Sequence, residues 1–106
     1  MSGAGGDPLD GFDTTIHAPH RLRICALLEG AGEAEFALVQ NQLGLSASAL
    51  SKHVTVLMDA GYVEQRKAVR DTRQRVWLRL TKRGRTAYQG HLTALRAIVE
   101  PSDPAP

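Results

Sequence analysis

The sequence contains a single cysteine, Cys25, among 106 residues. One thiol forms neither an internal disulfide nor a cysteine-clustered zinc site, so a disulfide-stapled secreted domain and a zinc finger are excluded. No apolar run approaches the roughly 20 residues that cross a bilayer. Residues 1–6 lack the positive charge and the apolar core of a secretory signal. We therefore expect a protein of the reducing cytoplasm that has no membrane partner.

The motifs of common enzymes are also missing. The sequence has no nucleophile elbow, phosphate-binding loop, carboxylate pair or metal-ligand cluster, and a short chain has little length left to build a pocket. We therefore expect no enzymatic activity, no cofactor and no metal. The four histidines (His17, His20, His53 and His91) are scattered without a pair at helical i, i+4 spacing. Cys25 lies in an apolar stripe, which favours a buried core residue over a redox-active thiol.

The net charge is only +2, but the charges are unevenly distributed. Residues 46–90 contain ten cations and three acids, whereas the rest of the chain contains three cations and eight acids. A basic half on a nearly neutral chain indicates a polyanionic partner that binds one face. The alternative is a solvated surface that is basic without a partner.

The chain has room for one domain. Glycines near the start and prolines near the end predict disordered tails at 1–8 and 100–106, which leaves a domain at 9–99. Apolar spacing predicts helices at 9–16, from Pro19 to about residue 30, and at 35–43. The second of these helices carries an apolar stripe of Leu22, Cys25, Ala26 and Leu28.

A fourth helix is predicted at 46–60, with the Ser46 hydroxyl capping its first turn. Its buried stripe consists of Leu50, Val54, Leu57 and Met58. The opposite face carries small or polar side chains without a carboxylate: Ala47, Ser48, Ser51, Lys52 and Thr55. Such a face suits the major groove of DNA, because bulky side chains block approach and carboxylates repel phosphates.

After Gly61 the apolar period changes from helical to strand-like. Strands are predicted at 62–67 and 75–80, with Trp77 packing at the base of the hairpin. The arginine-rich segment 68–74 lacks the Asn-Gly or Asp-Gly signal of a two-residue turn, so we expect a longer tip. Thr81 then caps a final helix that runs to about Val99. The predicted fold is mainly α with a two-stranded β-hairpin wing: a winged helix-turn-helix with an extra C-terminal helix.

Specific residues carry a resemblance to a known family. Ser46-Ala-Ser-Ala-Leu-Ser-Lys-His53-Val-Thr-Val-Leu57, followed by Asp59-Ala-Gly61-Tyr-Val63-Glu, resembles the recognition helix and first wing strand of ArsR-type and MarR-type bacterial regulators. Leu80-Thr81-Lys-Arg-Gly84 resembles the start of the last helix in MarR-type proteins. The resemblance covers about residues 16–99 and implies a homodimeric repressor that binds operator DNA.

The resemblance also assigns candidate residues. It implies that residues of the fourth helix lie at double-stranded DNA and that the hairpin arginines at 66–75 lie over the backbone or the minor groove. The candidate DNA-binding residues are Ser46, Ser48, Ser51, Lys52, His53, Thr55, Arg66, Arg70, Arg73 and Arg75. For His53 the alternative is a structural position against the wing. Another alternative for the whole chain is a winged-helix interaction module that binds an acidic protein.

The last helix carries more apolar residues along one side than a small core needs. We interpret this stripe as a dimer seam to which the first helix contributes, the alternative being packing within one chain. The candidate dimerisation residues are Leu9, Phe12, Tyr88, Leu92, Leu95 and Val99. The chain lacks the long flanking helices that form the effector pocket of MarR-type proteins, so whether a small-molecule effector exists stays open.

Overall fold

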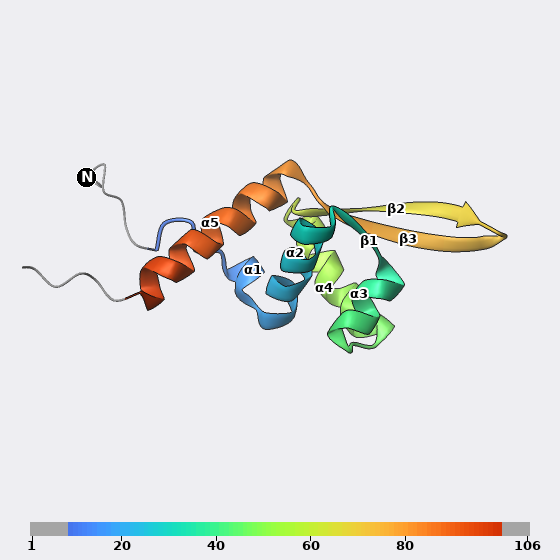
Figure 1. Cartoon of the computed structure of the whole chain (residues 1–106), viewed down its shortest axis with the longest axis horizontal. Helices are drawn as coiled ribbons and strands as arrows, with labels where there is room; N and C mark the ends of the chain where they lie inside the picture. The colour runs from blue at the N-terminus through green and yellow to red at the C-terminus, as the bar shows by residue number, and fades with distance from the viewer. Residues whose placement is uncertain (1–8, 101–106) are drawn as a thin grey trace, which may run out of the picture.

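The computed structural model describes residues 9–100, in which five helices accompany a small antiparallel sheet (Figure 1). The tails predicted at 1–8 and 100–106 lie outside this range except for Glu100, which follows the last helix. The elements in chain order are α1 (Thr14–His17), α2 (Pro19–Ala31), β1 (Glu33–Glu35), α3 (Phe36–Leu43), α4 (Ala47–Asp59), β2 (Val63–Arg70), β3 (Arg73–Leu80) and α5 (Lys82–Val99). The mainly helical winged fold is the one predicted.

The helix boundaries follow local chemistry. Pro19 opens α2, where a missing N–H costs nothing. The Ser46 hydroxyl accepts the Ala49 N–H at 3.1 Å and begins α4, and the Thr81 hydroxyl accepts the Gly84 N–H at 2.9 Å and begins α5. Because these caps act within four residues, the sequence pattern located both helices correctly.

The prediction of a helix at 9–16 was wrong in its extent. Only Thr14–His17 is helical, and the Asp13 carboxylate caps it by accepting the Ile16 N–H at 3.0 Å. Gly11 has a φ of +87°, and a Cβ at this position would lie 2.8 Å from the Gly90 carbonyl oxygen. The chain therefore turns at Gly11 and passes close to α5 before α1 begins.

The sheet has three strands in the order β1-β3-β2, not the two that the hairpin pattern predicted. The additional strand β1 pairs antiparallel with β3, with Ala34 opposite Leu78. It has only three residues, two of them glutamates, so the sequence offers no apolar alternation to reveal it. The third helix accordingly begins at Phe36, directly after this strand.

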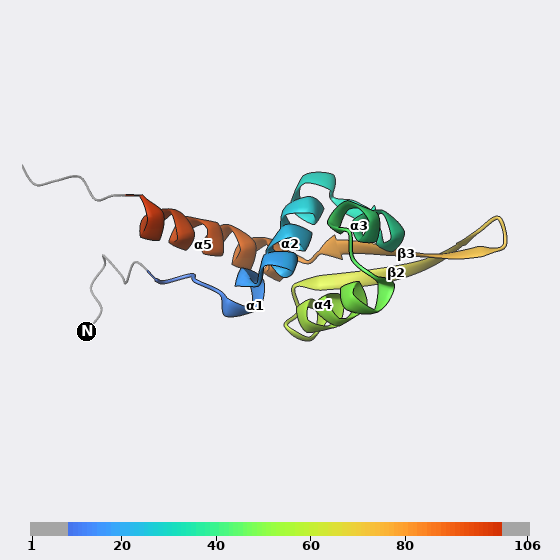
Figure 2. The same ribbon diagram turned by 90° about the horizontal axis from the view of Figure 1, so that it is seen from below.

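The hairpin tip is shorter than predicted. The strands β2 and β3 continue to Arg70 and Arg73, which are paired, so the connection consists of Asp71 and Thr72 alone. Both residues have positive φ, 54° and 64°, as in the type I′ turns that match the twist of antiparallel strands. The strands extend beyond the helices as a long wing (Figure 2).

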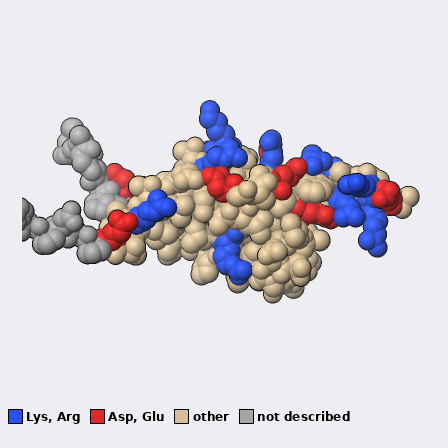
Figure 3. Space-filling model, viewed as in Figure 1, with Lys and Arg blue, Asp and Glu red and all other residues tan. Residues whose placement is uncertain are grey.

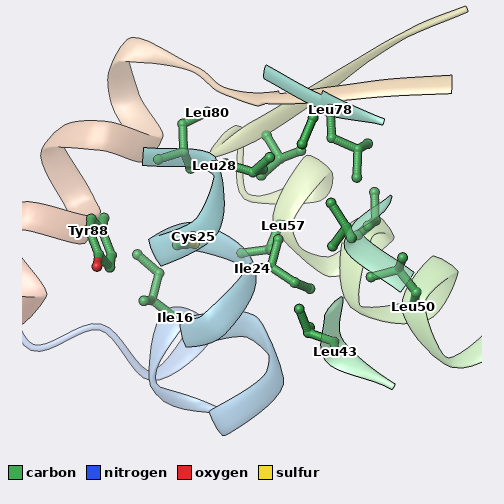
Figure 4. Close-up of a cluster of buried hydrophobic side chains, with 14 residues drawn as sticks. Ile16, Ile24, Cys25, Leu28, Leu43, Leu50, Leu57, Leu78, Leu80 and Tyr88 are labelled. Carbon is green, nitrogen blue, oxygen red and sulfur yellow. The ribbon is translucent and has the colours of Figure 1, made fainter. Parts of the chain in front are cut away.

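One apolar core joins the helices to the inner face of the sheet (Figure 4). Leu28 of α2, Leu50 and Leu57 of α4, and Leu78 of β3 are fully buried in it. Ile24 is buried in α2, whereas Ala26, predicted to lie in the apolar stripe, is exposed. Cys25 and Leu28, three residues apart, lie on the buried face of α2, and Ala26 lies on its exposed face. None of the helices within residues 9–100 is both long enough and apolar enough to cross a membrane.

Candidate nucleic-acid interface

The exposed face of α4 is the centre of the candidate interface. Core packing of Leu50, Val54 and Leu57 directs the opposite face to solvent. Four predicted contact residues of this helix lie exposed there: Ser48, Ser51, Lys52 and Thr55. Ser46 is also exposed at the helix N-terminus, where its hydroxyl lies 3.4 Å from that of Ser48. The structure therefore brings these five residues together on one face of the chain.

His53 is oriented differently from these residues. It is half-buried, and the Arg21 guanidinium of α2 lies 3.3 Å from its Nδ1, with the His20 ring centred 5.4 Å from its own. Burial, and then the charge of Arg21, lowers the pKa of His53. Since Arg21 only donates, Nδ1 must accept, so the ring proton is on Nε2. His53 thus packs against Arg21 and His20 of α2.

The outer face of the sheet holds a set of ion pairs. Arg66 donates from Nε and Nη2 to the two carboxylate oxygens of Glu33, at 3.2 and 3.0 Å, and its guanidinium lies 5.7 Å from the centre of the Trp77 ring. Arg75 donates from Nη1 to both oxygens of Glu35 at 3.0 Å. The hydrogen bond from Arg66 lowers the pKa of Glu33. Two of the four predicted wing contacts are therefore already paired with acids of β1.

Other cations of the wing and of α4 are available to a polyanion. Four of these cations form no ion pair within residues 9–100: Arg70, Arg73, Lys67 and Lys52. Lys67 lies four residues after Val63 on β2, so the two side chains project from the same side of the sheet. Val63 points into the core, so Lys67 lies on the side that the helices cover. Lys67 is not among the contact residues predicted from the sequence. The two-residue alternation of the strand is the pattern that could have identified it. Figure 3 shows basic side chains gathered along the wing, with acidic ones between them.

The face of α5 predicted as a dimer seam divides into two parts. Tyr88 is only 8% exposed and belongs to the core of its own chain, which corrects its assignment to the seam. Leu92 and Leu95 are half-buried, whereas Ile98 and Val99 are 48% and 72% exposed. Leu9 is 54% exposed, and Phe12 packs against His17 and His91 with ring centres 4.8 Å apart. The distal half of α5 extends away from the other helices (Figure 1).

Cys25 and the histidines complete the inventory of reactive groups. Cys25 is fully buried, and this burial, followed by the charge of Asp13, raises its pKa to about 12. The thiol is therefore a core residue, as predicted. His17 and His91, which are 74 positions apart, are hydrogen-bonded in the fold. In the part of the chain that the structure describes, no group of three or more potential ligands could hold a metal ion.

Comparison with known proteins identifies the family. The model of the winged helix DNA-binding domain matches residues 20–99. The chain is 32% identical over 72 residues to an uncharacterized protein of Methanocaldococcus jannaschii, covering 68% of this chain and 78% of that protein.

Two solved structures have the same fold. A transcriptional regulator homologue from Pyrococcus horikoshii OT3 is 29% identical, with a TM-score of 0.77 over 81% of this chain and 85% of that one. The transcriptional repressor BigR from Xylella fastidiosa is 28% identical, with a TM-score of 0.59 over 84% and 82%. The resemblance predicted from the sequence is thereby confirmed: the chain belongs to the winged helix DNA-binding domain family and is a DNA-binding transcription regulator of the MarR/ArsR-like type.

Proposed function

We propose that this chain is a homodimeric repressor that binds double-stranded operator DNA sequence-specifically. The observation that carries the proposal is the exposed face of α4, which presents Ser48, Ser51, Lys52 and Thr55 beside a wing with unpaired cations. The helix enters the major groove, where the hydroxyls contact base edges and Lys52 contacts phosphate. A regulator that acts on a bacterial chromosome works in the cytoplasm.

The wing cations divide into two roles. Arg70, Arg73 and Lys67 bind phosphates or the minor groove, because no carboxylate within residues 9–100 neutralises them. Arg66 and Arg75 are held by Glu33 and Glu35, so they brace the wing against β1 and contact DNA only when those ion pairs open. The ion pairs thus separate Arg66 and Arg75 from Arg70 and Arg73, which the sequence analysis names together as candidate contacts.

A second copy of the chain supplies the other half of the operator contact. The exposed apolar residues Ile98, Val99 and Leu9, next to the half-buried Leu92 and Leu95, favour association through α5 and the segment before α1. A two-fold dimer then presents two α4 helices to half-sites about one helical turn, roughly 34–36 Å, apart.

Selection of bound oligonucleotides from a random duplex pool tests this function. The proposal requires an enriched palindromic sequence, and the purified chain must bind it in a salt-dependent manner. Lys52→Ala and Arg73→Ala are each expected to weaken binding to all sequences and to flatten the salt dependence by about one unit of slope per lost contact. Lys82→Ala is the matched control, because Lys82 is exposed at the base of the wing, at the far end of β3 from the tip.

Two results would contradict the proposal. A chain that stays monomeric and ignores duplex DNA even in dilute buffer would leave the winged-helix module with an acidic protein partner as the better interpretation. Unchanged salt slopes for both variants would remove Lys52 and Arg73 from the interface.

A further inference from the structure

A hydrogen-bonded network lies where α5 meets the start of the described chain. His91 is fully buried, the only buried polar side chain in the core of residues 9–100. The Asp13 backbone N–H donates to its Nδ1 at 2.9 Å, and its Nε2 lies 3.2 Å from Nδ1 of His17. The Phe12 ring packs against both imidazoles.

The donors in this network determine the protonation of both rings. Because a backbone N–H points at Nδ1 of His91, this nitrogen must carry a lone pair. Nε2 of His91 therefore bears the ring hydrogen and donates it to Nδ1 of His17, which must also be unprotonated. The arrangement requires two neutral imidazoles. A proton added to His91 at Nδ1 would face the Asp13 N–H, and one added to His17 at Nδ1 would face the donor of His91.

Asp13 connects this pair to the end of the recognition helix. Its Oδ1 caps α1, and its Oδ2 accepts the Tyr62 O–H at 2.5 Å. Tyr62 lies between α4 and β2, and its own carbonyl accepts the Thr81 N–H at 2.9 Å, just before α5. One aspartate thus joins α1, α5 and the junction between α4 and the wing. If Asp13 separates from His91, its contacts with α1, with α5 and with the junction between α4 and the wing all change.

We propose that the His17–His91 pair is a proton-sensitive joint: proton uptake breaks its contact with Asp13 and loosens the attachment of α5 and α1 to the DNA-binding half of the chain. The consequence for operator affinity rests on the proposed function. The joint itself does not, because it is defined by contacts within one chain.

The surrounding groups favour the neutral rings. Burial, followed by the charge of His17, lowers the pKa of His91, and the carboxylate of Asp13 opposes this shift. The other titratable or charged groups around the network are Tyr62 after α4, Arg83 over the Tyr62 ring, Cys25 of α2 and Tyr88 of α5. The pKa values of Cys25 and both tyrosines are raised, so these groups stay protonated in mild acid. None of these three groups therefore takes up a proton below neutral pH.

The direction of the pH effect follows from these shifts. A histidine whose pKa is lower in the fold than its unfolded value of about 6.5 leaves stability unchanged above that pH, because both states are then neutral. As the pH falls below about 6.5, the unfolded chain binds the proton more readily and the fold loses stability. With an unfolded pKa of about 6.5, this effect can raise the unfolding equilibrium constant by at most about thirtyfold at pH 5 relative to pH 8.

NMR titration of the intact chain tests the joint without DNA. We expect the ring signals of His91 to titrate with a midpoint below about 6.5, with the Asp13 amide and the Tyr62 ring signals shifting at the same midpoint. Titration of His91 at or above its ordinary value, or of His91 with no response from Asp13, would overturn the proposal.

A variant gives an independent measurement. His91→Gln keeps a hydrogen-bonding side chain that cannot take up a proton. It is expected to reduce the acid sensitivity of unfolding between pH 8 and 5, by at most the same thirtyfold. The unaltered chain is the reference. Equal acid sensitivity in His91→Gln and the unaltered chain would contradict the joint. A joint confirmed by NMR in a chain that binds no operator would refute only the proposed function.

Discussion

Replacement of Glu33 by glutamine is expected to tighten binding to duplex DNA. Glu33 accepts two hydrogen bonds from Arg66, and the side chains of the pair are 36% and 56% exposed, so solvent and ions reach both. Glutamine retains one acceptor oxygen but removes the negative charge. Arg66 is then free to exchange this partner for a DNA phosphate, and a like-charge repulsion between Glu33 and the backbone disappears.

The expected magnitude follows from counterion release. Each additional phosphate contact steepens the slope of log K against log salt concentration by about 0.9. Each added contact therefore makes the loss of affinity between 50 and 200 mM salt about 3.5-fold larger. For a two-fold dimer that gains one contact in each protomer, this loss becomes about twelvefold larger. The gain is largest at low salt and is independent of DNA sequence, because phosphates carry no sequence information.

Fluorescence anisotropy titrations of one labelled duplex at four or more salt concentrations measure this slope. Glu29→Gln is the matched control: Glu29 also pairs with an arginine, Arg85, but it links α2 to α5 and lies away from the wing. Equal slopes for Glu33→Gln and the unaltered chain would refute the reasoning that Arg66 is withheld from DNA by its acid partner. Unaltered thermal unfolding of Glu33→Gln would exclude a damaged wing as the cause of any loss.

The remaining predictions concern the fold and the dimer. Gly84→Ala would place a Cβ over the Tyr62 carbonyl oxygen, a backbone atom, and is expected to lower the free energy of unfolding by about 2–4 kcal/mol in urea titrations; an unchanged midpoint would contradict the close approach of α5 to Tyr62. Val99→Asp is expected to shift the chain toward monomer in light-scattering measurements, whereas Tyr88→Phe, a change inside the core, is expected to leave its mass unaltered. Cys25, with a pKa of about 12, should react with a thiol reagent at pH 8 only after unfolding; rapid labelling of the native chain would show that it is accessible.

The start of three helices and the exposed face of α4 were determined by the sequence. Pro19, Ser46 and Thr81 begin three of the helices, and the spacing of Leu50, Val54 and Leu57 alone decides that Ser48, Ser51, Lys52 and Thr55 are exposed on α4. These signals act over one or two helical turns, so they can be identified without knowledge of the rest of the fold.

The tertiary structure decided which arginines of the wing form ion pairs and which do not. The segment Glu33–Glu35 is a strand only because β3 offers it a free edge, and this pairing places its carboxylates beside Arg66 and Arg75. The pairing of His17 with His91 likewise depends on the crossing of α1 and α5. Such contacts join residues 33 to 74 positions apart. No local pattern encodes them, since they depend on which surfaces the packed core brings together.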